Sequence, residues 1–190
     1  MVPVWAVSSR YGRVVTFVVV TGQPGSGKST LAVQLADRLG LSLLAKDTIK
    51  EALASPEDRA MLTVGRSQKL GAASFKVIFA IAQQSGGAVL EASWSPALAR
   101  ERLVNLPHPL IEIHCQCPPD LARQRYVERA SHRHWIHLDA TRAHEAELWA
   151  SPGPHDLSDP VIIVDTTKPV DVDALLVEVV SHPSWIQHVD

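Results

Sequence analysis

The sequence predicts an α/β domain in which helices cover both faces of a five-stranded parallel sheet, giving three layers. Five short apolar runs alternate with longer segments in which apolar residues recur at helical spacing, and this alternation is typical of a parallel sheet wrapped by helices. A glycine-rich turn joins the first run to the first helical segment. Because 190 residues suffice for one such domain and are few for two, residues 1–190 are expected to form a single domain.

The predicted strands are short and apolar. The first is apolar on both faces, as expected for a central strand that helices cover from both sides. The third has Val89, Leu90 and Glu91 at its centre and follows a Gly-Gly pair that ends the preceding helix. In chain order, strands are predicted at residues 14–20, 41–45, 88–92, 110–115 and 161–164.

Helices are predicted between the strands, and their ends carry the usual signals. Gly40 stands in the position of a C-cap, Ser55 and Pro56 form a helix start, and Pro107 and Pro109 terminate a later helix. In chain order, the helices are predicted at residues 28–39, 49–53, 66–84, 97–106, 118–130, 140–150 and 171–180.

Composition and charge restrict the class of protein. Charged residues make up 20% of the chain and the formal net charge is −2, so the chain as a whole lacks the basic character of a nucleic-acid-binding protein, although a local basic groove is compatible with that charge. Residues 1–13 lack the features of a secretory signal, and no apolar run reaches the length of a membrane span. We expect a soluble cytoplasmic protein with Cys115 and Cys117 as free buried thiols. Nothing in the sequence indicates an oligomeric state.

The turn after the first strand matches the P-loop pattern at every fixed position. Its glycines allow backbone amides to approach an oxyanion, and the N-terminus of the following helix points at the same place. A lysine supplies charge for the outer phosphates, a serine hydroxyl is placed to bind Mg²⁺, and a threonine hydroxyl serves the phosphates nearer the sugar. The predicted ATP-binding residues of this turn are Gly22, Pro24, Gly25, Ser26, Gly27, Lys28, Ser29 and Thr30.

Three carboxylates lie at or near predicted strand ends, where a parallel sheet binds its ligands. Asp47 follows the second strand, Glu91 lies in the third and Asp165 ends the fifth. A carboxylate beside a Mg-nucleotide either holds the metal shell or accepts a proton from an attacking hydroxyl. Asp47 is alternatively a plain N-cap of the helix at 49–53. Glu91 and Asp165 compete for the role on the metal side, and the residues alone do not choose between them.

A group of arginines follows the fourth strand. Arg125 and Arg129 are four residues apart, so on a helix they share a face from which both could reach a transferring phosphoryl group when that segment closes. The alternative is a solvated face paired with Glu128. Zinc binding by nearby histidines is a further alternative, but no cysteine is near and the ligand spacing is irregular. The basic residues of this region are Arg123, Arg125, Arg129, His132, Arg133, His134, His137 and His144.

Several segments, taken in order, resemble a known family. They are Gly-Gln-Pro-Gly-Ser-Gly-Lys-Ser-Thr, Leu-Ala-Lys-Asp-Thr-Ile-Lys-Glu-Ala-Leu, Val-Leu-Glu-Ala-Ser-Trp, Arg-Gln-Arg-Tyr-Val-Glu-Arg, Arg-His-Trp-Ile-His and Val-Asp-Thr-Thr. Together they resemble the small P-loop kinases often labelled AAA-family ATPases. That group is similar to polynucleotide 5′-hydroxyl kinase domains, chloramphenicol phosphotransferase and zeta-type toxins. The resemblance covers roughly residues 15–180.

The resemblance implies an adenylate-kinase-like P-loop NTPase fold with a helical lid at about 123–152, in which the third strand lies beside the first. That arrangement would put Glu91, with Ser29, near Mg²⁺. Two departures from the family pattern stand out. The family usually has aspartate in place of Glu91, and its Arg-His-Pro-Gly-His is replaced at 133–137 by Arg-His-Trp-Ile-His, which implies a stiffer and more apolar lid tip.

The resemblance also implies individual roles for residues outside the P-loop. Asp47 would act as base on the acceptor hydroxyl, and Arg125 and Arg129 would belong to the mobile lid. The loop after Asp165, which includes Thr167, would lie by the adenine.

The sequence and the resemblance together predict an ATP-dependent phosphotransferase that moves the γ-phosphoryl group of Mg-ATP to a hydroxyl of a small molecule. Residues 49–81 and Trp94 are expected to shape the acceptor pocket. One alternative is a polynucleotide or nucleoside 5′-hydroxyl kinase, which would need a basic channel for a strand end. Another is a regulatory ATPase without an acceptor. A guanine-specific switch is disfavoured because the sequence has no Asn-Lys-x-Asp.

Overall fold

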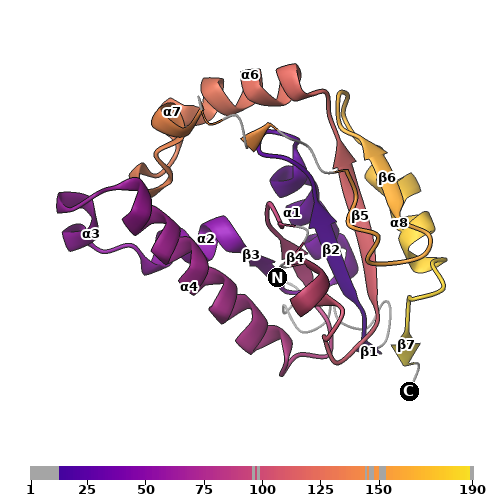
Figure 1. The fold of residues 1–190 in the computed structure, drawn as a ribbon. Helices are drawn as coiled ribbons and strands as arrows, with labels where there is room; N and C mark the ends of the chain where they lie inside the picture. The colour runs from indigo at the N-terminus through magenta and orange to yellow at the C-terminus, as the bar shows by residue number, and fades with distance from the viewer. Residues whose placement is uncertain are drawn as a thin grey trace, which may run out of the picture.

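The computed structural model describes residues 13–95, 97, 99–143, 145, 148–149 and 153–188. A five-stranded parallel sheet with the order β3-β4-β2-β5-β6 forms its centre (Figure 1). The strands are β2 (Phe17–Thr21), β3 (Leu43–Ala45), β4 (Val89–Glu91), β5 (Leu110–Gln116) and β6 (Ile162–Asp165). The predicted α/β class is confirmed. In this order β4 lies beside β2, as the resemblance implied.

Helices lie on both faces of this sheet. They are α1 (Lys28–Leu39), α2 (Lys46–Leu53), α3 (Pro56–Ala60), α4 (Val64–Ala82), α6 (Pro119–Arg129), α7 (Asp139–Arg142) and α8 (Val172–Val180). Successive side chains of a strand point to opposite faces. Val18 and Val20 of β2 therefore pack in the core beneath α1 and α8, whereas Phe17 and Val19 pack in the core beneath α4. The central strand is thus covered on both sides, as its apolar sequence predicted.

The second helix begins earlier than the sequence suggested. α2 follows β3 directly, and its N-cap is Ala45, whose side chain makes no capping hydrogen bond. Asp47 lies inside the first turn, so the interpretation of Asp47 as the N-cap is wrong. The carboxylate of Asp47 is therefore not used as a cap, and it lies near the positive end of the α2 dipole.

Two other predicted helices are shorter than expected. In the segment expected to be helical at 97–106, the structure has a π-helical turn, Ala99–Leu103. The helix predicted at 140–150 is only α7, and residues 144, 146, 147 and 150 of that prediction lie outside the described residues. The carbonyl of Ala143 accepts a hydrogen bond from the indole of Trp149 at 3.2 Å. Sequence periodicity does not reveal this contact between Trp149 and Ala143.

The ends of the described chain form a feature that the sequence did not predict. β1 (Arg13–Val14) pairs in an antiparallel manner with β7 (Gln187–His188). Cys115 and Cys117 are buried and unpaired, as expected, and burial raises the pKa of Cys115 to about 12. No helix among the described residues is both long and apolar enough to span a membrane.

Candidate active site

The P-loop connects the central strand to α1. Gly27 is the N-cap of α1, with φ 86°, a left-handed conformation that glycine adopts readily. Gly25 also has a positive φ of 80°, and a Cβ atom there would lie 2.1 Å from the carbonyl oxygen of Ala122 in α6. The turn therefore passes so close to α6 that a side chain cannot fit. Because the N-cap is a glycine, no side chain of its own covers the first amides of α1, and these can face an anion.

Lys28 and Ser29, at the start of α1, lie next to Glu91, which ends β4. Glu91 is in register with Val20 of β2. The hydroxyl of Ser29 donates to Oε1 of Glu91 at 3.2 Å, and Nζ of Lys28 lies 3.9 Å from the same oxygen. Nζ of Lys28 also donates to the carbonyl of Gln23 at 3.2 Å. Burial lowers the pKa of Lys28, and the charges of Glu91 and Asp47 oppose that shift. A hydroxyl and a carboxylate in contact provide the oxygen ligands that Mg²⁺ prefers, so these residues fit that ion.

Asp165 occupies a different place. It ends β6, which pairs with β5 and not with the P-loop strand. Its carboxylate accepts a hydrogen bond from the amide of Thr167 at 2.9 Å in an exposed turn. Of the two carboxylates that competed for the metal side, the structure brings Glu91 and not Asp165 to Ser29. This difference follows from strand order, which the chain sequence does not specify.

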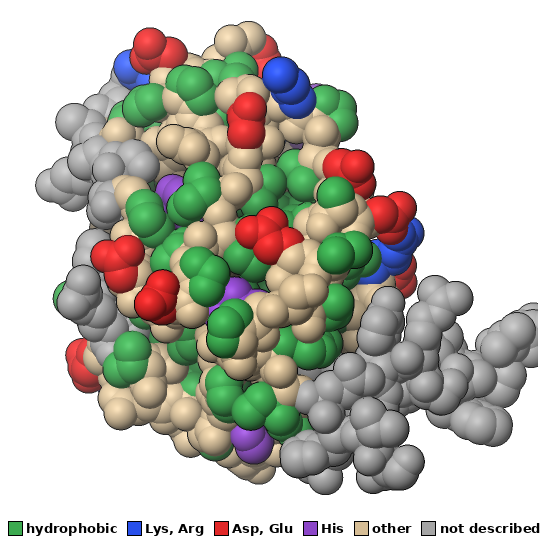
Figure 2. All heavy atoms as spheres, turned by 90° about the vertical axis from the view of Figure 1, so that its right-hand side faces the viewer, with side chains coloured by type: hydrophobic (Ala, Val, Ile, Leu, Met, Phe, Trp, Pro, Cys, Tyr) green, Lys and Arg blue, Asp and Glu red, His purple; other side chains and the backbone are tan. Residues whose placement is uncertain are grey.

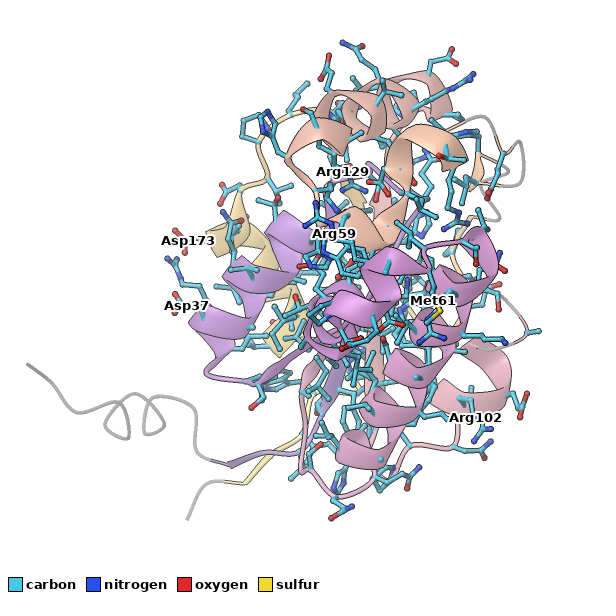
Figure 3. The ribbon with its side chains drawn as sticks, turned by 90° about the vertical axis from the view of Figure 1, so that its left-hand side faces the viewer. Asp37, Arg59, Met61, Arg102, Arg129 and Asp173 are labelled. Carbon is cyan, nitrogen blue, oxygen red and sulfur yellow. The ribbon has the colours of Figure 1, made fainter. Side chains whose placement is uncertain are left out.

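A cavity of about 220 Å³ lies between the P-loop and the segment that carries α6 and α7. This segment crosses over the sheet at the edge where the parallel strands end (Figure 1). In Figure 3, Arg129 lies between this segment and the helices of the first half of the chain. Among the described residues, the titratable groups lining the cavity include six lysines and arginines (Lys28, Lys46, Lys50, Arg129, Arg133 and Arg142), three carboxylates (Asp47, Glu91 and Asp139) and the imidazole of His137. Cations therefore outnumber carboxylates in the lining.

Asp47 is surrounded by cations in this cavity. Its Oδ2 accepts a hydrogen bond from Nη2 of Arg133 at 2.9 Å, and its Oδ1 accepts one from Nζ of Lys46 at 3.0 Å. Nδ1 of His137 lies 3.9 Å from Oδ1. Burial disfavours the ionised carboxylate, but the charges of Lys46, His137 and Arg133 outweigh it and hold the pKa of Asp47 well below its usual range. Asp47 is therefore an ionised carboxylate in the same cavity as the P-loop lysine.

The two arginines expected to act together line different cavities. Arg129 faces Asp47's cavity, where its Nε lies 3.9 Å from Oδ2 of Asp139. Arg125 instead donates to the carbonyls of Thr166 at 2.9 Å and Thr167 at 3.4 Å. The structure therefore does not bring Arg125 and Arg129 together at one cavity, and their joint action on a phosphoryl group stays a prediction. Helical spacing placed both residues correctly on α6. It did not indicate that Arg125 would hydrogen-bond to the loop after β6.

A second cavity, of about 390 Å³, lies on the other side of the P-loop helix start. It is lined by Gly27, Thr30, Arg125, Thr166 and Lys168, among others. Thr30 is thus next to the loop that follows β6, and the backbone of Thr167 is tied to Arg125. The structure therefore brings the loop after Asp165 to the P-loop on the side away from Asp47.

Several charged residues of the first cavity were not predicted as site residues. Lys50 is three residues after Asp47 in α2, so helical spacing could have indicated it. Asp139 accepts a hydrogen bond from the hydroxyl of Tyr126 at 2.9 Å, and His137 bonds to Glu51 at 2.7 Å; these long-range contacts have no sequence signal. Trp94, expected near the acceptor, instead packs in the core against Phe75 and Phe79.

The histidine-rich segment is not assembled around a metal in the part of the chain that the structure describes. There, no three histidine, cysteine, aspartate or glutamate side chains are grouped closely enough to hold a metal ion. His137 is buried against Glu51, and His134 accepts a hydrogen bond from the amide of Ile136 at 3.3 Å. His144 lies outside the described residues.

Comparison with known proteins gives a consistent result. Residues 17–150 match a family described as AAA domain. A presumed kinase from Chloroflexus aurantiacus is 27% identical, with a TM-score of 0.73 over 88% of this chain and 97% of that chain. A gluconokinase from Sinorhizobium meliloti (20% identity, TM-score 0.54, 83% and 86% coverage) and a shikimate kinase from Acinetobacter baumannii (17%, 0.54, 94% and 97%) share the fold. A search of curated proteins finds no match.

Proposed function

The chain belongs to the AAA domain family and has the fold of small P-loop kinases, and from this premise we propose that it transfers the γ-phosphoryl group of Mg-ATP to a hydroxyl of a small molecule. The observation that carries the proposal is the position of Asp47. Its carboxylate lines the same cavity as the ammonium of Lys28. A carboxylate beside the phosphate-binding lysine is what a hydroxyl acceptor requires, whereas ATP binding alone does not require it.

In the proposed mechanism, the amides of the P-loop and the charge of Lys28 hold the β- and γ-phosphates. Gly22, Pro24, Gly25, Ser26 and Gly27 shape this cradle. Ser29 and Glu91 would hold Mg²⁺, which neutralises the charge of the phosphates when bound. Each of these groups is fixed by its strand or helix end before the substrates bind, so little reorganisation is needed.

The groups proposed to act on the acceptor are Asp47 and the arginines of the segment that carries α6 and α7. Asp47 orients the acceptor hydroxyl and accepts its proton, and Arg129 compensates the charge that moves with the phosphoryl group. We infer that residues 123–152 act as a lid over this step. Arg125 and Thr167 are assigned to the nucleoside side, with Thr30, because they border the second cavity or its loop.

A nucleic-acid 5′-hydroxyl kinase is the less favoured alternative. A strand end needs a basic channel that continues along the surface, whereas the cavity with Asp47 holds about 220 Å³. On the side of the molecule shown in Figure 2, acidic and apolar side chains are more prominent than lysine and arginine. That side therefore offers no basic track.

The experiment that tests the proposal is an Asp47→Asn substitution. Transfer of ³²P from Mg-[γ-³²P]ATP to candidate sugars, hydroxy acids, antibiotics, nucleosides and oligonucleotides identifies the acceptor. With that acceptor, Asp47→Asn is expected to lower kcat at least 100-fold while Mg-ATP binding in calorimetry stays within about twofold. Asp37→Asn is the matched control, because Asp37 is exposed on the outer side of α1 (Figure 3). Full activity in Asp47→Asn would reject the role of Asp47.

A further inference from the structure

Lys50 is a buried charge in the active-site cavity. Its side chain comes from α2, lines the cavity with Asp47 and is only 2% exposed. Its ammonium donates to the hydroxyl of Ser67 at 2.7 Å. Among the described residues, no carboxylate lies within 4.0 Å of it, although the other lysines of the cavity, Lys28 and Lys46, each have one at 3.9 Å or less. A buried charge without an opposite charge in contact with it is costly, so its presence at a ligand cavity calls for a reason.

Ser67 holds this ammonium in a fixed place. The hydroxyl of Ser67, in α4, donates its own hydrogen to the carbonyl of Ile136 at 2.7 Å. It can therefore only accept from Lys50. An ammonium has three donors, and Ser67 takes one of them. The remaining two are available to a ligand, because Lys50 lines the cavity. These two hydrogen bonds, from Lys50 to Ser67 and from Ser67 to Ile136, also connect α2 and α4 to the segment between α6 and α7.

Asp47 shares the cavity with both this ammonium and the P-loop lysine. The charge of Asp47 acts on both Lys28 and Lys50. The other charges close to Lys28 are Glu91 and Arg129, whereas those close to Lys50 are Lys46, Arg142 and Arg133. Lys28, on the P-loop side, and Lys50, among other cations, therefore have different charged neighbours apart from Asp47, which acts on both. A bound acceptor with its hydroxyl at Asp47 would extend toward Lys50.

We propose that the acceptor is a small hydroxy compound that carries an anionic group, either a carboxylate or a phosphate monoester, and that Lys50 binds this group. The inference rests on the proposed phosphotransferase function and specifies its substrate class. Two available donors on a fixed ammonium suit an oxyanion, whereas a neutral polyol would leave the charge uncompensated. The cavity volume of about 220 Å³ is below the roughly 300 Å³ of the smallest pockets for drug-sized ligands, which indicates a compact acceptor.

The first test measures anion binding without catalysis. The protein is saturated with Mg-AMP-PNP, which fills the P-loop, and titrated with inorganic phosphate by calorimetry at constant ionic strength. The wild type is expected to bind one phosphate. Lys50→Met and Lys50→Gln are both expected to weaken that binding at least tenfold, while Lys76→Met, at an exposed position on α4, leaves it unchanged. Circular dichroism establishes that each variant is folded.

The outcomes of this titration separate the two proposals. Phosphate binding that is absent from the loaded wild type, or that survives in both Lys50 variants, overturns the inference and leaves the phosphotransferase proposal intact. Failure of the wild type to bind Mg-AMP-PNP would instead overturn the proposed function.

The second test compares matched acceptors that differ only in the anion. Transfer of ³²P is measured for glycerate against glycerol, gluconate against sorbitol, and ribose 5-phosphate against ribose. At least one anionic member is expected to exceed its neutral partner tenfold or more in kcat/KM, and Lys50→Met is expected to remove this preference mainly through KM. The pair that responds distinguishes a carboxylate from a phosphate. Neutral partners that are phosphorylated equally well would overturn the inference.

Discussion

The guanidinium of Arg133 lies on the carboxylate of Asp47, with 2.9 Å between Nη2 and Oδ2. The contact joins α2 to the segment that follows α6, across 86 residues of sequence. Arg133 occupies one lone pair of that oxygen, so an acceptor hydroxyl would have to share the carboxylate with the guanidinium. In this structure the proposed base is therefore held by Arg133. Binding of the acceptor must rearrange or share this ion pair.

The first prediction concerns the pKa of Asp47. Arg133 is one of the cations that hold this pKa below its ordinary value, so Arg133→Met is expected to raise it by about one unit or more. A ¹³C NMR titration of the aspartate carboxyl carbons, with Asp47→Asn for assignment, measures the change. Arg123→Met is the control, because Arg123 is exposed on α6. An unchanged pKa in Arg133→Met would show that the ion pair is not maintained in solution.

The second prediction compares two glycines with positive φ. At Gly40, with φ 65°, a Cβ atom would have no neighbour within 4 Å, whereas a Cβ atom at Gly25 would meet the Ala122 carbonyl at 2.1 Å. Gly40→Ala is expected to lower the free energy of unfolding by about 1 kcal/mol, from backbone strain alone. Gly25→Ala adds a backbone collision, so we expect a loss of about 3 kcal/mol or more and no measurable Mg-ATP binding. Urea unfolding and calorimetry measure both; equal effects would contradict the close approach of α6.

The parts of this site that sequence predicted are those encoded locally. The P-loop at 22–30 has a fixed spacing, so its place between β2 and α1 followed directly. Glu91 needed the order of the strands, which only the resemblance provided. Arg133 on Asp47, and Ser67 beneath Lys50, depend on packing between segments far apart in the chain, for which a single sequence has no signal. Arg125 shows a different limit. The helix that carries it was predicted correctly, but its hydrogen bonds to the loop after β6 were not.

The third prediction tests the metal side. Glu91 contacts Ser29 at 3.2 Å, while Asp165 lies two strands away from β2. Glu91→Gln is therefore expected to weaken the apparent affinity for Mg²⁺ in the presence of ATP about tenfold, with little change in nucleotide binding in EDTA. Asp165→Asn should leave both unchanged. Titration of Mg²⁺ against nucleotide affinity measures the effect, and a larger loss in Asp165→Asn would reverse the assignment.

The fourth prediction is that Lys50 lowers stability in the absence of substrates. Burial, assisted by the charge of Lys46, lowers the pKa of Lys50 from 10.5 to about 8. The unfolded chain then binds more protons than the folded protein between about pH 8 and 10.5, so stability rises with pH across that window and the penalty is complete below pH 8. Lys50→Met should therefore be more stable than the wild type at pH 7, by up to roughly 3 kcal/mol. The difference should shrink by pH 9.5. Urea unfolding of both proteins at each pH measures it, and Lys76→Met controls for the loss of a surface lysine. A Lys50→Met variant that is less stable at pH 7 would mean that Asp47 or another negative charge already compensates the ammonium in the free protein, which removes the physical argument for an anionic acceptor.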